Sequence, residues 1–253
     1  MKTVTFSIIA LAGLIFLSSC NNDAKNNQEI QAVVTDSIPV AVTPKAMYVT
    51  AVSGLTLREH PNLQSEKLAV MPLGTKLKIV TSEGKATMNV GGIEGAMDEV
   101  EFNNKKGFAF NGFMSKFFPP EEDALAKNYA EELKKDFPNV IYSEATGGSV
   151  SKPTKTETLI LPTSKWHESF FTAQQLFNIP KEFAFPNPKG ANNETQQSRS
   201  KKKTDFISEL QISRNENELQ KIVYNYKTTG FGYVVTITKD ANNMKLEKVE
   251  VAD

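Results

Sequence analysis

Apolar and polar positions alternate with a period of two from residue 46 to about residue 118. Leu55 and Leu57 share one face of a predicted strand, and Leu77 and Ile79 share one face of another. Residues typical of turns separate these short runs: Gly54, His60-Pro61-Asn62 and Pro72-Leu73-Gly74. Several short strands placed so close together predict a small β-barrel or β-sandwich.

After residue 118 the spacing of apolar residues changes and predicts a helix. Pro120 lies near its first turn, and the acidic residues that follow suit the positive end of the helix dipole. Leu125, Tyr129 and Leu133 form its apolar face. Pro138 forbids its continuation, because proline removes a backbone donor and clashes with the preceding turn.

Two short strands, at residues 140–143 and 156–161, are predicted to precede a second helix that ends at Pro180. Thr163 or Ser164 is its expected N-cap. An aromatic stripe at helical spacing forms its core face: Trp166, Phe170, Ala173 and Phe177.

Residues 183–203 are predicted as a long polar loop, whose three-lysine run is either solvated or in contact with an anionic lipid or wall polymer. Three or four strands follow it. Apolar residues alternate along them: Ile222, Tyr224, Tyr226, Phe231, Tyr233, Val235 and Ile237. In the last strand the alternation changes parity between Leu246 and Val249, which predicts a β-bulge.

The predicted fold class is mainly β plus α+β. Residues 46–118 form a small β-barrel, and residues 119–253 form an α+β domain in which two helices pack on an antiparallel sheet. A composition of 40% hydrophobic residues with 16 Phe supplies a core. The 29 Lys and Arg balance the 29 Asp and Glu, so net charge gives no reason to expect a nucleic-acid partner.

Cys20 is the only cysteine of the chain, and a lone cysteine is a buried apolar residue, a reactive thiol or a site of modification. Residues 1–19 carry the three parts of a secretory signal, with Lys2, an apolar run and small residues up to Ser19. The sequence "LSSC" resembles the bacterial lipobox. This resemblance implies cleavage between Ser19 and Cys20 and acylation of Cys20, as with palmitate. The alternative is an ordinary signal peptide in which Cys20 is incidental.

Residues 20–45 then form a lipidated cysteine followed by a tether, which its polar composition predicts to be disordered. Stable anchoring needs more than one acyl chain, and an acylated cysteine supplies two or three. The expected location is therefore a bacterial cell envelope, with the membrane as partner through the anchor. The outer membrane is favoured where the organism has one, because Asn21 rather than Asp follows the cysteine.

The first folded segment resembles a bacterial SH3 (SH3b) domain. The resemblance rests on "VSGLTLREHPNLQSEKLAVMPLGTKLKI" and on the closing "KKGFAFNGFMS". It implies a small β-barrel that docks a peptide or a cell-wall component, with Tyr48, Arg58, Phe108 and Phe110 as candidate ligand-binding residues. The alternative is that these four residues are core or incidental surface. In "GAMDEVEF", Met97 stands where the family often has Trp, and Phe108 stands where Trp or Tyr is common.

No residue pattern for a cofactor, a metal or a catalytic nucleophile is present. Acylation uses the one thiol, and the two histidines, His60 and His167, have no metal-ligand spacing. His60 is expected to be a solvated turn residue. The sequence therefore predicts a non-catalytic adaptor lipoprotein whose partner is peptidoglycan or an envelope protein. The alternative is a cell-wall glycosidase that uses carboxylates of the C-terminal domain, since a carboxylate pair leaves no sequence signature.

Overall fold

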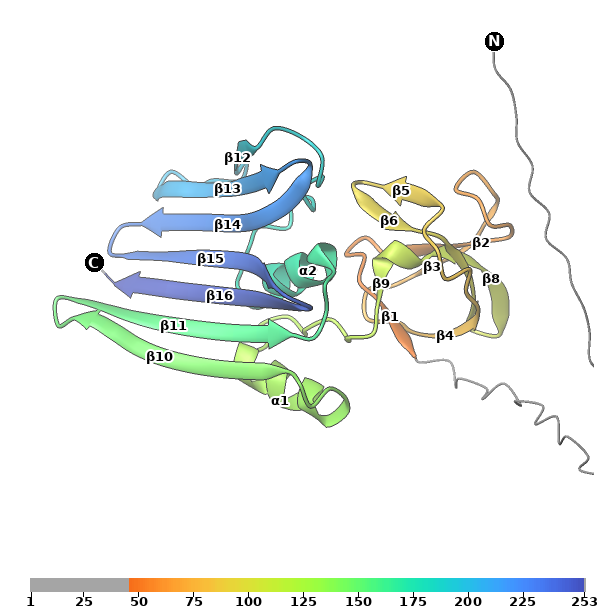
Figure 1. Cartoon of the computed structure of the whole chain (residues 1–253), viewed down its shortest axis with the longest axis horizontal. Helices are drawn as coiled ribbons and strands as arrows, with labels where there is room; N and C mark the ends of the chain where they lie inside the picture. The colour runs from red at the N-terminus through yellow and green to blue at the C-terminus, as the bar shows by residue number, and fades with distance from the viewer. Residues whose placement is uncertain (1–45, 253) are drawn as a thin grey trace, which may run out of the picture. The chain divides into compact units, whose positions relative to one another are not determined.

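The computed structural model describes residues 46–252. The predicted signal sequence, Cys20 and the whole of the predicted tether lie outside the described residues. Strands dominate this part of the chain, with two α-helices and antiparallel pairing throughout (Figure 1). The prediction of a mainly β chain with an α+β part is confirmed at this level. Neither helix between residues 46 and 252 has the length and apolarity that a membrane crossing requires.

Seven strands in the first half form one sheet, in the order β3-β2-β8-β7-β4-β1-β9. Their bounds are Met47–Val49 (β1), Leu55–Arg58 (β2), Lys67–Met71 (β3), Lys76–Thr81 (β4), Met97–Phe102 (β7), Lys105–Phe110 (β8) and Met114–Ser115 (β9). A separate hairpin pairs β5 (Met88–Val90) with β6 (Ile93–Gly95), and a 3₁₀ turn, η1, spans Asn111–Phe113. The sheet is open, with β3 and β9 at its edges, so its strands do not close into the small β-barrel predicted from the sequence.

The core of this first half follows the alternation in the sequence. Leu55 and Leu57 are buried together on β2, as predicted. On β4, Leu77 is buried and Ile79 is half-buried against the same core. Because β-strand side chains point alternately to the two faces, a period of two is enough to fix which residues face inward.

Helix α1 spans Ala126–Asp136 and begins later than predicted. Pro120 and the three acidic residues after it precede the helix, and Asp123 has a φ of +60°, which is incompatible with a helical turn. Leu125 is the N-cap residue and is 66% exposed, whereas Tyr129 and Leu133 are buried as expected. The helix ends just before Pro138.

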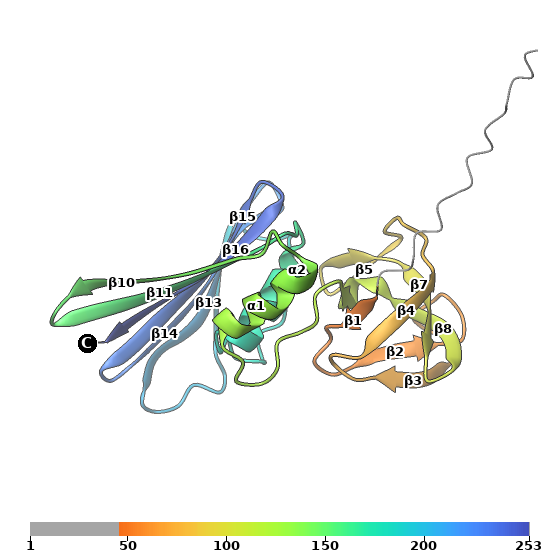
Figure 2. The ribbon, with the colours of Figure 1, turned by 90° about the horizontal axis from the view of Figure 1, so that it is seen from below.

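The second sheet has the order β10-β11-β16-β15-β14-β13-β12, all antiparallel. Its strands are Ile141–Ser149 (β10), Lys152–Leu161 (β11), Asn193–Gln197 (β12), Asp205–Asn215 (β13), Glu218–Thr228 (β14), Phe231–Asp240 (β15) and Asn243–Ala252 (β16). Both helices lie on one face of this sheet and leave the far ends of its strands uncovered (Figure 2). The predicted strand meander at the end of the chain is confirmed.

Helix α2 spans Trp166–Leu176, with Lys165 at the N-cap. The predicted cap was Thr163 or Ser164, but no side chain caps the helix. Thr163 instead accepts a hydrogen bond from the backbone N–H of Lys165 at 3.2 Å and donates one to Glu168 at 2.6 Å. Three residues of the predicted stripe face the core as expected, namely Phe170, Ala173 and Phe177. The fourth, Trp166, is only half-buried.

Two further expectations for the second half are wrong. The predicted polar loop contains a strand, β12, which pairs with β13 along its whole length. The predicted bulge in β16 is absent, because its register with both neighbours is regular. The parity of apolar residues changes because Lys248 takes an inward-facing position, where it is 9% exposed and its Nζ lies 4.9 Å from the ring of Tyr233.

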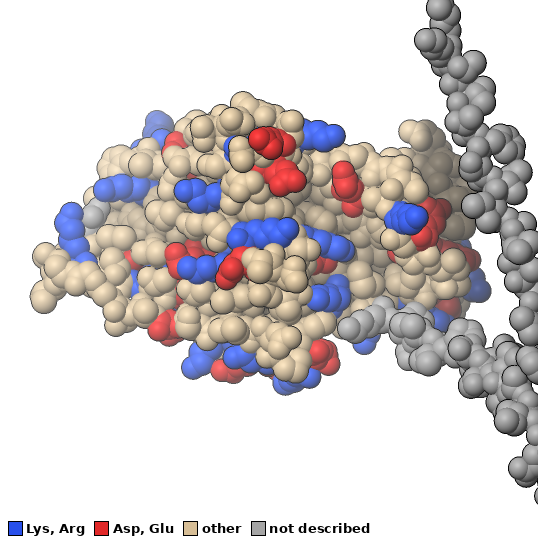
Figure 3. Space-filling model, in the orientation of Figure 1, with Lys and Arg blue, Asp and Glu red and all other residues tan. Residues whose placement is uncertain are grey.

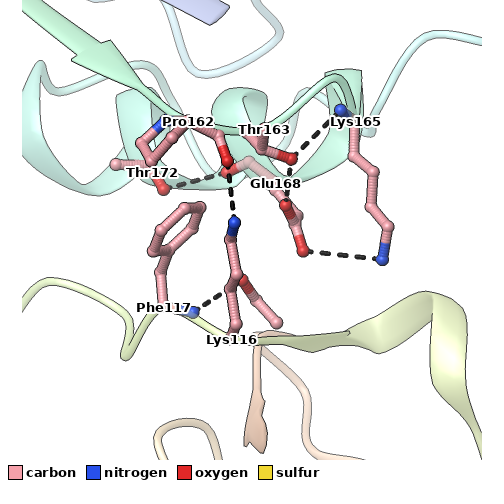
Figure 4. A network of polar contacts seen from close by, with 8 residues as sticks. Lys116, Phe117, Pro162, Thr163, Lys165, Glu168 and Thr172 are labelled. Atoms are coloured by element: carbon pink, nitrogen blue, oxygen red, sulfur yellow. Dashed lines mark hydrogen bonds and ion pairs between the residues drawn. The ribbon is translucent and has the colours of Figure 1, made fainter. Parts of the chain in front are cut away.

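One hydrophobic core runs through both halves of the described chain. Lys116, just after β9, reaches across and donates to the carbonyl oxygen of Pro162 at 2.7 Å (Figure 4). The ring of Phe117 packs edge-on against Phe137 with centroids 4.8 Å apart. The hydroxyl of Tyr129 on α1 donates to the carbonyl oxygen of Phe118 at 2.8 Å. These contacts join the two sheets through the segment between them.

Candidate functional site

An open cavity of about 550 Å³ lies against both halves of the described chain. Its lining from the first half consists of the turn 51–54, three residues of β2 and five residues from other segments: Leu55, Thr56, Arg58, Leu63, Val90, Met97, Phe110 and Phe113. Its lining from the second half includes Phe171 and Gln174 of α2, and Lys181 and Phe183 of the segment that follows. Binding cavities of this size are commonly apolar with a few polar groups, and this one has that composition.

The turn 51–54 depends on a glycine. Gly54 has a φ of +85°, in the region that favours glycine, and its N–H donates to the carbonyl oxygen of Ala51 at 2.9 Å. A Cβ atom at this position would lie only 2.7 Å from Cγ1 of Val70 on the neighbouring strand β3. The close approach of β2 and β3 therefore needs Gly54, and it sets the rim of the cavity.

Phe110 forms an aromatic wall of the cavity. Its ring packs edge-on against Phe113, with centroids 5.5 Å apart. A Cβ atom on Gly95 would lie 2.7 Å from this ring, so the glycine leaves the space that the ring occupies. Phe110 is 3% exposed and belongs to the core as well as to the cavity wall.

Arg58 is the only charged residue of the first half that lines the cavity. It is the last residue of β2 and lies opposite Phe108 in the pairing with β8. One of its terminal nitrogens, Nη1, donates to the carbonyl oxygen of Ser65 at 2.7 Å. No carboxylate within residues 46–252 lies at ion-pair distance from it. Within residues 46–252, the bond to Ser65 is the hydrogen bond that its guanidinium group makes.

Hydrogen bonds of two side chains, Gln174 and Glu182, hold the cavity wall that comes from the second half. The amide nitrogen of Gln174, a buried residue of α2, donates to the carbonyl oxygens of Pro180 and Phe183, both at 3.0 Å. Glu182 accepts hydrogen bonds from the hydroxyls of Ser198 and Ser200 and from the backbone N–H of Ser200. These donors lower the pKa of Glu182 to about 2, with Ser198 contributing most. The segment that carries Lys181 and Phe183 is therefore fixed in position.

The four candidate residues do not form one site. The cavity brings Arg58 and Phe110 together, along with Met97, which stands in the position where the SH3b family often has Trp. Phe108 is half-buried against the core and does not line the cavity. Tyr48 lies elsewhere, with its ring packed edge-on against Phe118 and 5.9 Å from Nζ of Lys76.

Sequence reasoning missed the second-half residues of the cavity. Phe171 follows the core residue Phe170 on α2, and Lys181 and Phe183 lie in a segment predicted as the helix end and a loop. More than a hundred residues separate them from Arg58 in the chain. Their only sequence signal was the concentration of phenylalanines between residues 170 and 185.

The histidines differ in their surroundings. His60 is exposed in a turn, as predicted, with its Nε2 3.7 Å from a carboxylate oxygen of Glu59. His167 lies against the ring of Phe185, and its Nε2 is buried without a hydrogen-bond partner. Burial, and secondarily the charge of Lys165, lower the pKa of His167 to about 3. Within residues 46–252 no group of His, Cys, Asp and Glu side chains is arranged to hold a metal ion.

A second cavity, of about 260 Å³, bears on the glycosidase alternative because Glu157 and Glu250 both line it. Nζ of Lys155 lies 3.5 Å from Glu157, and Nζ of Lys248 lies 2.6 Å from Glu250. The hydroxyl of Tyr142 is 2.9 Å from Glu157 and 2.5 Å from Glu144. Both carboxylates that line this cavity are therefore paired with lysines.

Neither a scan against protein-family models nor searches among curated proteins and solved structures found a protein that matches this chain. The candidate site therefore rests on the geometry of the cavity. The surface in Figure 3 shows basic and acidic side chains interspersed, with no large area of one sign on the face in view. The cavity differs from this surface, because Arg58 and Lys181 are its only charged lining residues and both are cationic.

Proposed function

We propose that this chain is a non-catalytic binding protein of a bacterial cell envelope, held at the membrane by acylation of Cys20. In this proposal residues 46–118 are an SH3b-like module that docks a peptide or a cell-wall component. The observation that carries the proposal is the 550 Å³ cavity that combines Arg58 and Phe110 of this module with Phe171 and Lys181 of the second half. A preformed apolar cavity with a few polar groups is suited to binding.

The anchor and the binding activity require separate tests. Metabolic labelling with palmitate tests the anchor: wild-type chain should incorporate label, and the Cys20→Ala variant should not. Label that persists in the variant would contradict acylation at this residue.

Binding is tested by incubating the full chain, in detergent, with purified peptidoglycan and with an envelope extract. We expect the chain to co-sediment with peptidoglycan or to retain an envelope protein. Arg58→Gln should reduce this retention at least fivefold, because it removes the cation of the first-half wall. Lys78→Gln is the control, since the Lys78 side chain is 68% exposed and outside the cavity lining. Failure of wild-type chain to retain anything from either material would contradict the binding proposal.

The glycosidase alternative makes a different prediction. It would use two carboxylates such as Glu157 and Glu250, which line one cavity and which glycoside hydrolysis could use as acid and nucleophile or base. Release of reducing sugar from peptidoglycan that is lost in Glu157→Gln, with binding retained, would favour it. The ion pairs of both carboxylates with lysines favour the non-catalytic proposal instead.

A further inference from the structure

The charge of the 550 Å³ cavity restricts the ligand. Arg58 and Lys181 line it, and no Asp or Glu does. The chain as a whole carries as many acidic as basic residues, so this positive character is local. The nearest carboxylate to Lys181 is that of Glu122, 3.8 Å away, in a pair whose two side chains are 57% and 85% exposed. Exposed pairs of this kind are weak, so Lys181 keeps most of its attraction for an incoming anion.

Arg58 has the geometry to recognise a carboxylate. Its planar guanidinium group carries five N–H donors, and one of its nitrogens is fixed by the carbonyl oxygen of Ser65. That hydrogen bond orients the group without neutralising its charge. A guanidinium group binds a carboxylate through two parallel hydrogen bonds, which are stronger than those between neutral groups.

The walls between these cations are apolar and aromatic: Leu55, Met97, Phe110, Phe113, Phe171 and Phe183. A ligand that fills the cavity must therefore carry an apolar group next to its negative charge. A small inorganic anion would leave these walls without a contact, and an uncharged apolar molecule would leave both cations without a partner.

An unpaired sheet edge, one strand away from the cavity, favours a peptide over a lipid. Leu55 and Thr56, which line the cavity, pair with Met71 and Val70 of β3. Strand β3 is an edge of the first sheet, and the Val70 side chain is 57% exposed. An edge strand presents backbone N–H and C=O groups that an extended peptide can pair with, and a fatty acyl chain cannot.

A third cavity, of about 660 Å³, has the opposite charge. It is lined by Glu121, Glu122, Asp123 and Glu132, with no Lys or Arg. A peptide that carries a carboxylate is attracted to the first cavity and repelled from this one. The two cavities therefore distinguish ligands by sign although the chain has no net charge.

We propose that the 550 Å³ cavity binds a peptide segment in which a carboxylate adjoins an apolar side chain. Arg58 holds the carboxylate, Lys181 adds electrostatic attraction, and the aromatic walls take the apolar side chain. This inference rests on the proposed binding function and defines the ligand class of the same site.

The test uses two synthetic probes that differ only in charge: N-acetyl-Ala-Leu-Phe with a free carboxylate, and the same peptide as its carboxamide. Binding to the full-length ¹⁵N-labelled chain in detergent is followed by amide chemical shifts. We expect the acid to bind at least tenfold more tightly than the amide, with shifts concentrated at the cavity lining. Arg58→Gln should abolish this difference, and Lys181→Gln should reduce it. Lys78→Gln, at an exposed lysine outside the lining, should leave it unchanged.

Equal affinity for the acid and the amide, or no binding of either, would overturn the inference. Laurate that binds the cavity more tightly than the peptide acid would overturn the choice of a peptide. If the chain is retained by envelope material but does not prefer the acid, the inference fails and the proposed function stands. If the acid binds as expected but no envelope material is retained, the ligand class stands and the envelope function fails.

Discussion

His167 is held in its uncharged form by its surroundings in α2. Its Nε2 atom is buried, its ring packs against Phe185, and the ammonium group of Lys165 opposes protonation. Its folded-state pKa of about 3 lies well below the ~6.5 of an unfolded chain. As pH falls below ~6.5 the unfolded chain therefore takes up the proton first, and the stability that this group contributes is lost progressively until the folded-state pKa is reached.

We predict that His167→Leu will flatten the pH dependence of the free energy of unfolding. Between pH 7.5 and pH 5.0, wild-type chain should lose about 2 kcal/mol more than the variant, because the variant has no group to protonate at this place. Urea titrations at the two pH values measure the difference. Leu125→Ala is the control, since Leu125 is exposed and has no titratable group, so the wild-type pH dependence should remain. Parallel pH profiles for wild type and His167→Leu would contradict the prediction.

Lys248 shows how a single inward-facing charge changes the meaning of a sequence pattern. On β16 it continues the inward series of Met244 and Leu246, and its ammonium group lies over Tyr233 and 2.6 Å from Glu250. The long side chain of Lys248 can lie along the sheet while its charge is paired with Glu250. A pattern of apolar residues alone cannot distinguish this arrangement from a bulge.

At the scale of elements, the edge strand β12 depends on one residue of its neighbour. The side chain of Arg214 on β13 is 1% exposed and makes three hydrogen bonds. Its Nε donates to the carbonyl oxygen of Asn187, Nη1 to that of Ala191 and Nη2 to the carboxylate of Glu194, at 2.8 to 2.9 Å. It therefore fixes the start of β12 and the connection that leads into it.

We predict that Arg214→Met will destabilise the chain by about 3 kcal/mol, because it removes three hydrogen bonds and the ion pair of a buried guanidinium group. Amide hydrogen exchange should rise first in residues 187–197, which Arg214 holds in place. Arg214→Lys should recover only part of the protection, because one ammonium group cannot replace three N–H groups that point in different directions. Arg199→Met, at an exposed arginine, is the control and should change neither quantity. Unaltered exchange at residues 187–197 in Arg214→Met would show that β12 does not depend on this contact.

Hydrophobic periodicity predicted the elements whose inward-facing residues are apolar and regularly spaced. It failed where a single buried polar residue holds an element in place. The strands β2, β4 and β14 to β16 follow from alternation at residues such as Leu57 and Leu77. Strand β12 has polar side chains throughout, and the buried partner that holds it, Arg214, lies in another strand. The cavity could not be predicted from the sequence either. The resemblance to SH3b domains groups Arg58 with Phe110, but nothing in the sequence indicates that α2 supplies the other wall.

At the scale of the whole molecule, the shared core implies that the two sheets unfold together. Lys116 is hydrogen bonded to Pro162, and Phe117 packs on Phe137, so the segment after the first sheet is buried in the second half (Figure 4). Two cores that exchange no contacts would unfold separately, whereas one continuous core unfolds as a cooperative unit. The cavity depends on the same continuous core, because α2 contributes residues both to this core and to the cavity lining.

We therefore predict that a defect in the first sheet will destabilise the second. Leu57 is fully buried on β2, and Leu57→Ala should cost about 3 kcal/mol. Trp166, the only tryptophan, lies in α2 and reports on the second half by its fluorescence. If the halves unfold as one unit, Leu57→Ala must lower the urea midpoint of the Trp166 signal as much as that of the far-ultraviolet circular dichroism. Leu125→Ala, at a leucine that is 66% exposed, is the matched control and should shift neither. A Trp166 transition that stays in place while the circular dichroism splits into two steps would mean that the sheets are independent, and the cavity would then have to be assembled by docking of two separately folded parts.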